Sequence, residues 1–190
     1  AFEAFDYAAA LQVVEESFWQ FCDHYLELVK LRSYADDDTP GRRSALATLG
    51  LALGTYLRLL APFMPYVTEE VWSWRFAGEG RARSVHTAPW PQPAELDGVP
   101  GAAVEGTFEA AVEVMTKVRG AKTLAQKSLR WPVVRLAITG PEASRAALQP
   151  VLDDILRAGN VVEGGLELHD GAAPENERFA ITVILGENDG

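Results

Sequence analysis

Two prolines, Pro62 and Pro65, constrain this chain more than any other feature of its sequence. Pro62 lacks an amide hydrogen and disfavours helical geometry at Ala61, so a helix that arrives from upstream should end there. Pro65 suits the first turn of a new helix. Apolar residues then recur at helical spacing and predict the buried face of that second helix: Val67, Val71 and Trp74. The sequence therefore predicts a tight corner between two helices.

The composition excludes several kinds of protein. A chain of 190 residues with 48% hydrophobic types can bury a sizeable core, in one domain or in two small ones. Its formal net charge of −10 argues against unselective binding to nucleic acid or anionic membranes, so any RNA contact must come from a local patch. The single cysteine, Cys22, cannot form an internal disulfide, and no apolar run reaches membrane-spanning length. We therefore expect a cytoplasmic protein without a membrane partner.

Helical periodicity dominates the larger, N-terminal part of the chain. Amphipathic patterns predict helices over residues 2–34 (continuous or with one break), 44–60 and 102–125. Between residues 77 and 101 the sequence is crowded with glycine and proline, which predicts a connection that wraps the helices and is anchored by Trp90. We therefore predict a mainly α fold, an antiparallel helical bundle that covers residues 1–128 and includes this connection.

The pattern changes to that of strands after Trp131. Runs rich in β-branched residues predict three strands, at 133–138, 161–168 and 179–185. The segment 142–158, between the first two, has helical spacing. This β-α-β-β order predicts a small C-terminal α/β lobe with a mixed sheet over residues 129–190.

Residues that could carry catalysis or hold a metal are few. No glycine-rich phosphate loop is present, and the three histidines are scattered. The carboxylate pairs occupy adjacent positions, and adjacent residues on a helix diverge by about 100°. Such pairs do not converge on one substrate atom. We therefore expect no catalytic residue, no metal site and no cofactor in this chain.

Trp19 is the first candidate for contact with a partner. It lies about a quarter-turn from the apolar arc of the first helix, on a stripe with Asp23, Glu27 and Lys30. Two interpretations are open. Either the indole packs against a neighbouring helix, or it forms a face that stacks on or contacts a partner.

The end of the predicted helix 102–125 opens the most basic part of the chain. From Lys117 to Arg135 the sequence contains no Asp or Glu. The candidates for phosphate contact in this strip are Lys117, Arg119, Lys122, Lys127 and Arg130. The alternative is an ordinary solvated helix end, where cations favour the negative pole of the helix dipole.

Three stretches of the sequence carry a family pattern: FWQFCDHYLELVKLR at residues 18–32, LRLLAPFMPYVTEEVW at 57–72 and HTAPWP at 86–91. Together they resemble the C-terminal anticodon-binding region of valyl-tRNA synthetase. The second stretch is shared in looser form by the isoleucyl, leucyl and methionyl enzymes, whereas FCD-x-YLELVK points to the valyl member. One departure is Ala61, where the valyl family often has histidine, so the isoleucyl enzyme is the alternative. The resemblance weakens from Ala102 onward.

The resemblance implies that the chain is a piece of a longer class I aminoacyl-tRNA synthetase. The parent enzyme would attach valine to tRNA(Val) using ATP. This part would hold the anticodon limb, and its partner within the parent would be the catalytic domain. The family's nucleotide-binding signatures, of the H-x-G-H and K-M-S-K-S types, are absent from this sequence. The chain alone should therefore not activate an amino acid.

Anticodon bases are splayed single-stranded bases, which proteins recognise by stacking and by hydrogen bonds to base edges. The candidates for these contacts cluster around the end of the first helix and the following loop: Trp19, Asp23, Lys30, Arg32, Tyr34, Arg42 and Arg43. A function of another class is also open. A helical protein-interaction module would present the Trp19 face and the basic strip to an acidic protein.

Overall fold

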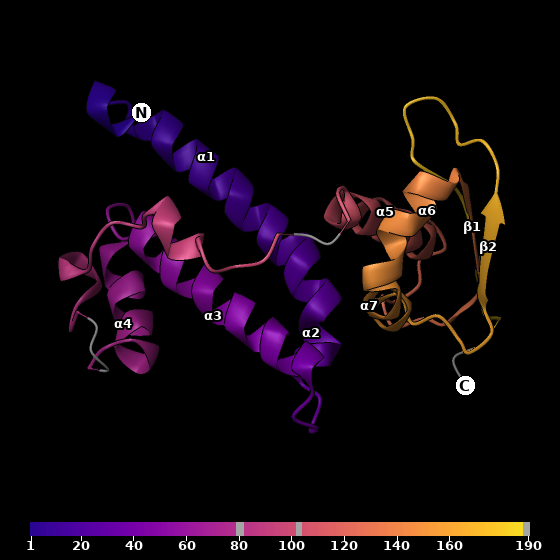
Figure 1. Ribbon diagram of the computed structural model, residues 1–190, viewed down its shortest axis with the longest axis horizontal. Helices are drawn as coiled ribbons and strands as arrows, with labels where there is room; N and C mark the ends of the chain where they lie inside the picture. The colour runs from indigo at the N-terminus through magenta and orange to yellow at the C-terminus, as the bar shows by residue number, and fades with distance from the viewer. Residues whose placement is uncertain (79–81, 102–103, 188–190) are drawn as a thin grey trace. The chain divides into compact units, whose positions relative to one another are not determined.

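The chain folds into two compact units in the computed structural model, which describes residues 1–78, 82–101 and 104–187 (Figure 1). Unit 1 comprises residues 1–26 and 35–100, and unit 2 comprises residues 27–34 and 101–190. Helices predominate, and a small three-stranded mixed sheet lies near the C-terminus. The predicted mainly α fold with a small mixed sheet is therefore confirmed.

Unit 1 is built from helices. Its elements are η1 (Phe2–Ala4), α1 (Tyr7–Gln20), the π-helix η2 (Phe21–Leu26), α3 (Pro40–Leu60), α4 (Pro65–Arg75) and the 3-10 helices η3 (Val85–Thr87) and η4 (Pro93–Leu96). Helix α3 begins at Pro40 rather than near the expected Ser44. The reason is a cap, because Oγ1 of Thr39 accepts a hydrogen bond from the Arg42 amide at 3.1 Å. Proline suits the position that follows the cap.

The corner predicted at Pro62 and Pro65 is present. Helix α3 ends at Leu60, whose carbonyl accepts hydrogen bonds from the amides of Phe63 and Met64 at 3.0 and 2.9 Å. Helix α4 then begins at Pro65. No strand lies between residues 46 and 76, all of which the structure describes.

The buried face of α4 differs from the predicted one. Val67 and Trp74 are 53% and 72% exposed, whereas Trp72 is 3% exposed. The indole of Trp72 packs against Phe76 with 4.9 Å between ring centroids, and its Nε1 donates to the carbonyl of Ala82 at 2.9 Å. Trp72 can make both the ring contact and the hydrogen bond only when its side chain points into the core. The prediction from helical spacing was therefore wrong for Val67 and Trp74.

A carboxylate fastens the connection that follows α4. Oε2 of Glu69 accepts hydrogen bonds from the Ser84 hydroxyl and the Val85 amide, both at 2.9 Å. Val85 is buried in the core of unit 1, together with residues of α3 and α4. Trp90, the expected anchor, is instead 42% exposed. The connection is thus pinned as predicted in its described part, but by Glu69 and Val85.

Unit 2 contains helices and the sheet. Its elements are α2 (Glu27–Ser33), α5 (Thr107–Leu124), β1 (Val133–Gly140), α6 (Glu142–Leu148), the 3-10 helix η5 (Gln149–Val151), α7 (Leu152–Ala158), β2 (Leu166–Asp170) and β3 (Ala180–Leu185). The helix expected over 142–158 is therefore broken in two. Pro150 lies in the break, where its missing amide cannot continue the helical hydrogen bonds.

The sheet has the strand order β2-β1-β3. β1 pairs with β2 in parallel, with Leu136 opposite Leu166, and with β3 in antiparallel, with Ile138 opposite Ile181. The mixed sheet and the β-α-β-β order match the prediction. β2 begins later than the expected residue 161, because the chain first turns at Gly164, whose φ is +76°.

Helices α5, α6 and α7 lie on one face of the sheet (Figure 1). The inward side chains of β1, Leu136 and Ile138, are fully buried, as is Ile155 of α7. α2 packs against α7 within the same unit. The predicted domain division at residue 128 would separate α5 from this sheet, whereas in the structure α5 contacts β3, α6 and α7.

A buried lysine joins three segments of unit 2. Lys122 on α5 is 1% exposed, and its Nζ donates to the carbonyl of Leu129 at 2.8 Å and to that of Gly159 at 2.7 Å. Leu129 lies in the turn after α5, and Gly159 follows α7. Burial lowers the pKa of the Lys122 ammonium. The two carbonyls supply hydrogen bonds that a buried cation requires.

Replacing Glu69 by alanine should loosen the connection and lower the free energy of unfolding by about 1–3 kcal/mol, since the buried Val85 amide loses its acceptor. Urea unfolding followed by tryptophan fluorescence measures this loss. The matched control is Glu70→Ala, because Glu70 is exposed and its carboxylate accepts a hydrogen bond from the Trp74 indole on the same helix. Equal losses in the two variants would contradict the role of Glu69.

Replacing Lys122 by methionine should remove a pH dependence of stability. Below its lowered pKa the wild-type ammonium is charged in both the folded and the unfolded state. Between that pKa and the ordinary value of 10.5 the unfolded state binds more protons, so the free energy of unfolding rises with pH. Urea unfolding at a series of pH values up to 10.5 should show this rise in the wild type and a smaller one in Lys122→Met. Identical slopes would assign the rise to other groups.

Candidate nucleic-acid interface

The Trp19 side chain projects from α1, and its ring packs against another aromatic ring of the same helix. The side chain is 58% exposed, and its ring meets Phe18 edge to face with 5.5 Å between centroids. Phe18 in turn contacts the ring of Tyr56 on α3 at 5.4 Å. The ring is therefore largely open to solvent rather than enclosed by helix packing. An exposed ring that is fixed in this way can stack on an unpaired base.

The charged side chains nearest to Trp19 in sequence are acidic. Glu15, Glu16 and Asp23 are all exposed. Such a surface repels phosphate, while its carboxylates can accept hydrogen bonds from the amino groups of bases. The Trp19 face therefore suits contacts with bases better than contacts with the RNA backbone.

Arg32 is used inside unit 2. Its Nη2 lies 3.3 Å from Oδ2 of Asp154 on α7, and Asp154 is 7% exposed. Burial raises the pKa of Asp154, and the charge of Arg32 opposes that rise. Removal of Arg32 would leave a buried carboxylate without its partner. Arg32 thus helps to pack α2 on α7, and its role as an anticodon contact stays a prediction.

The other anticodon candidates are exposed or half-buried at several places. Lys30 pairs with Glu27 at 3.3 Å, and Tyr34 is 74% exposed. Arg42 and Arg43 occupy the first turn of α3, where Nη1 of Arg43 lies 3.0 Å from Oδ2 of Asp38. Trp19, Asp23, Arg42 and Arg43 belong to unit 1, whereas Lys30, Arg32 and Tyr34 belong to unit 2. The predicted cluster is therefore divided between the two units, and its RNA contacts stay a prediction.

The basic strip is less available to phosphate than its sequence implies. Lys117 pairs with Glu177 at 2.7 Å, and Arg119 is half-buried. Lys122 is buried on two carbonyls, so its assignment as a phosphate contact is corrected. Lys127 and Arg130 are exposed. The run without acidic residues hid these pairings, because the partners come from segments far away in the sequence.

Arg135, at the end of the same run, is also paired. Its Nε and Nη2 donate to the two carboxylate oxygens of Glu167 on β2, both at 2.8 Å. These hydrogen bonds lower the pKa of Glu167 to about 2, with a further contribution from His169. A bidentate pair of this kind leaves the guanidinium fewer donors for a phosphate.

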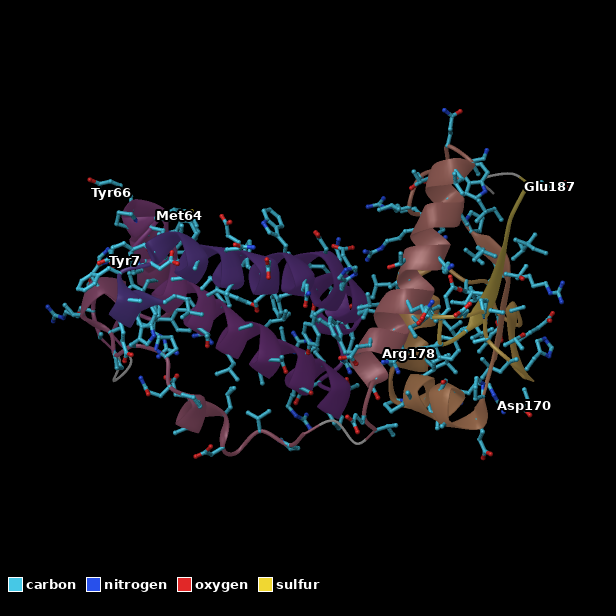
Figure 2. The ribbon with its side chains drawn as sticks, turned by 90° about the horizontal axis from the view of Figure 1, so that it is seen from above. Tyr7, Met64, Tyr66, Asp170, Arg178 and Glu187 are labelled. Carbon is cyan, nitrogen blue, oxygen red and sulfur yellow. The ribbon has the colours of Figure 1, made fainter. Side chains whose placement is uncertain are left out.

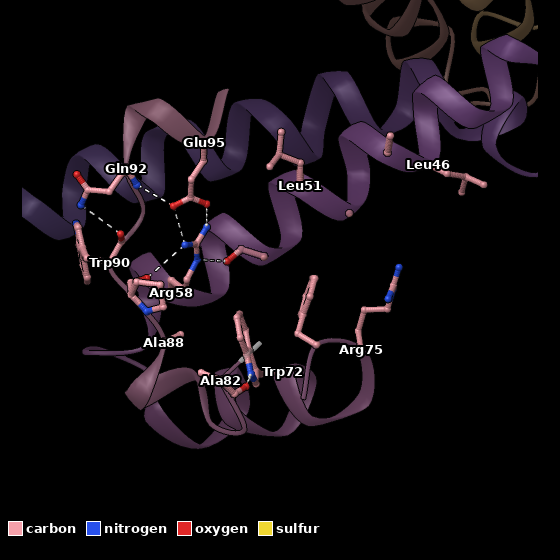
Figure 3. Close-up of a pocket in the computed structure, with 15 residues that line it drawn as sticks. Leu46, Leu51, Arg58, Trp72, Arg75, Ala82, Ala88, Trp90, Gln92 and Glu95 are labelled. Atoms are coloured by element: carbon pink, nitrogen blue, oxygen red, sulfur yellow. Dashed lines mark hydrogen bonds and ion pairs between the residues drawn. The ribbon is translucent and has the colours of Figure 1, made fainter. Parts of the chain in front are cut away.

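A groove of about 750 Å³ runs along α3 in unit 1 (Figure 3). Its α3 wall contains small residues, Ala47, Gly50 and Gly54, and other parts of its lining come from Trp90 and Gln92. Gly54 allows close approach of the Phe76 ring, since a Cβ at this position would lie 3.3 Å from a carbon of that ring. The groove has the size and the apolar walls of a site for a small organic group.

An ion pair lies beside this groove and fixes part of its lining (Figure 3). Arg58 on α3 donates to both carboxylate oxygens of Glu95, at 2.9 and 2.6 Å, and to the carbonyl of Pro89 at 3.3 Å. The same guanidinium donates through Nε to the carbonyl of Gly54 at 2.9 Å. The sequence patterns did not predict this groove. The signal for it was the pair of glycines, Gly50 and Gly54, one helical turn apart in α3.

Exposed apolar side chains also gather at one end of unit 1. Tyr7, Met64 and Tyr66 lie at this end in Figure 2 and are 51%, 45% and 90% exposed. Phe5, next to α1, is 77% exposed and meets the Tyr7 ring edge to face. Scattered exposed apolar residues are common, but several aromatic rings at one end are a feature of interaction surfaces.

A metal-binding cluster and a membrane-spanning helix are both missing from the described ranges, residues 1–78, 82–101 and 104–187. No group of three or more His, Cys, Asp or Glu side chains in these ranges could hold a metal ion. Within the same ranges, every helix is too short or too polar to cross a bilayer.

A family model for the anticodon-binding domain of tRNA ligases matches residues 1–136. The match covers α1, the corner between α3 and α4, the connection and α5, and it ends within β1. It therefore includes the Trp19 face, the groove and the whole basic strip.

The chain is also similar to curated valine–tRNA ligases. It is 40% identical over 189 residues to that of Leifsonia xyli subsp. xyli, and this alignment covers 94% of this chain and 21% of the relative. It is 44% identical over 175 residues to that of Salinispora arenicola, with 84% of this chain and 20% of the relative covered. For Bifidobacterium longum the identity is 40% over 209 aligned positions, with 98% and 22% covered. The chain thus spans about a fifth of the length of these relatives, and it belongs to the anticodon-binding domain family of tRNA ligases.

Proposed function

We propose that this chain is the part of a valine–tRNA ligase that binds the anticodon limb of tRNA(Val). The observation that carries the proposal is the match of the anticodon-binding family model to residues 1–136. The named relatives are valine–tRNA ligases, which favours the valyl over the isoleucyl enzyme in spite of Ala61. Unit 1 supplies surfaces of the kind that unpaired bases require, namely the exposed Trp19 ring and the apolar groove.

The proposal extends to the parent enzyme. The parent would attach valine to tRNA(Val) with ATP, and its catalytic domain would be a partner of this chain. Nucleotide binding belongs to that domain, so no cofactor is assigned to the residues described above. The finer arrangement of an antiparallel bundle, as in class I anticodon-binding domains, and a cytoplasmic location are part of the same proposal.

The charge distribution supports selective rather than general RNA binding. The chain carries a net charge of −10, and Lys117, Arg135 and Arg32 already have carboxylate partners. These cations are therefore less available to neutralise phosphates. Binding should therefore depend on contacts with bases as well as on counterion release, and its dependence on salt should be modest.

The chain should bind a tRNA(Val) anticodon stem-loop more tightly than one with a mismatched anticodon. Trp19→Ala combined with Arg43→Ala should reduce this preference by about 1–3 kcal/mol, because a stacking ring and a donor are removed. Trp74→Ala is the control, since Trp74 is 72% exposed on α4. Affinities across a salt series, with circular dichroism as a check of folding, measure the effect. Full discrimination by the Trp19 variant would place the anticodon site elsewhere.

The isolated chain should not catalyse valine-dependent exchange between pyrophosphate and ATP. The sequence lacks the nucleotide-binding signatures of this enzyme class. The exchange assay should therefore give background rates with this chain and a clear signal with an intact valine–tRNA ligase as control. Exchange by a pure preparation of the chain would refute this division of labour.

A further inference from the structure

The turn after α5 presents an unusual mixture of exposed side chains. We define this tip as residues 124–130, in the sequence LAQKSLR. Leu124 is 88% exposed and Leu129 is 58% exposed, and between and after them lie the exposed cations Lys127 and Arg130. Burial of an exposed leucine against a partner is favourable by about 25 cal/mol for each Å² of apolar surface removed from water. The tip therefore combines apolar contact area with positive charge.

The tip has a fixed shape. Gln126 adopts a left-handed φ of +54°, and the Lys127 amide donates to the carbonyl of Lys122 at 2.9 Å. The buried ammonium of Lys122 donates a hydrogen bond to the Leu129 carbonyl at 2.8 Å. The side chain of Asn160 donates to the carbonyl of Arg130. These hydrogen bonds join the tip to α5 and to the segment after α7, so the backbone that carries the two leucines is held at several points.

The tip's cations differ from the other cations of the basic strip. Nζ of Lys127 lies 3.7 Å from the ring centroid of Trp131, and the Trp131 indole donates to the carbonyl of Gly186 at 2.8 Å. Among the residues that the structure describes, neither Lys127 nor Arg130 has a carboxylate within ion-pair distance, in contrast to Lys117. The tip follows the negative end of the α5 dipole, and the buried charge of Lys122 offsets that pole.

We propose that the tip is an RNA-binding element that recognises a place in tRNA where unpaired base faces lie beside phosphates, and that Lys122 is its positioning residue. The proposal rests on the proposed function and adds a site and a class of RNA surface to it. The cations would meet phosphates, and the leucines would pack on base faces that are not stacked within a helix. A regular RNA stem exposes its phosphates but not its base faces. It should therefore contact the cations of the tip but not its leucines.

The test separates the apolar contribution from the charged one. In a fluorescence titration with a tRNA(Val) transcript over a salt series, Leu124→Ser/Leu129→Ser should lose affinity on the order of tenfold at every salt concentration. Its slope of log affinity against log salt should stay unchanged. Lys127→Ala/Arg130→Ala should instead lower that slope by about 0.7–0.9 for each phosphate that is no longer neutralised. With a fully paired RNA duplex, the leucine variant should bind like the wild type.

Matched variants control for surface and charge. Leu96→Ser/Val99→Ser removes two apolar residues that are 52% and 54% exposed in unit 1. Arg157→Ala/Arg178→Ala removes two exposed cations from unit 2. Both controls should retain wild-type affinity for the transcript and a wild-type salt slope to within experimental error.

Lys122→Met tests the positioning role. It should lower the affinity for the transcript, and it should have little further effect when Leu124 and Leu129 are already serine, because both changes act through the same leucine side chains. Val118→Ala, which opens a cavity at a side chain 1% exposed on α5, is the control for reduced stability. It should leave tRNA affinity unchanged under conditions where the variant is folded.

The outcomes are distinguishable. If the wild-type chain binds no tRNA, the proposed function fails and the inference fails with it. If the wild type binds tRNA and the leucine variant binds equally well, or if the leucine variant loses equal affinity for the duplex, only the inference is overturned. An acidic protein as the true partner of the tip would give the first of these two results.

Discussion

Unit 1 depends on the corner at Pro62 and Pro65. The corner turns α4 back, so that Trp72 and Phe76 pack into a core with Leu57 of α3. That core in turn receives Val85, and the connection is then held where Glu69 and Arg58 can bond to it. The groove along α3 exists only because the connection is fastened in this position. The motif that carries the family resemblance therefore supplies part of the core beneath this surface, through residues such as Leu57 and Trp72.

Several cations of the chain serve as internal partners. Arg32, Arg58 and Arg135 each pair with a carboxylate, and Lys122 is buried on two carbonyls. In a chain with an excess of acidic residues, a cation is more easily matched inside the fold than left for a ligand. Cations that are matched inside the fold gain little from the phosphates common to all RNA, so under the proposed function contacts with bases should contribute to selectivity.

Sequence patterns predicted the structure best where local rules decide it. The helix end before Pro62, the start at Pro65 and the three strands with their mixed order follow from proline geometry and residue periodicity. The same patterns failed where a distant partner decides. Helical periodicity predicted that Trp74 is buried, but Trp72 is buried instead, because its indole donates a hydrogen bond to the carbonyl of Ala82. Lys122 looked like part of a phosphate strip because its acceptor Gly159 lies far along the chain.

The π-helix η2 (Phe21–Leu26) affects how the first helical stretch should be compared with its relatives. Each π-type hydrogen bond spans one residue more than an α-type bond, and one residue corresponds to about 100° of rotation in an α-helix. A helical wheel drawn without interruption from Trp19 to Lys30 therefore assigns the later residues to the wrong side. Alignments of this region should accordingly allow a single-residue gap within 21–26 without treating it as a loop.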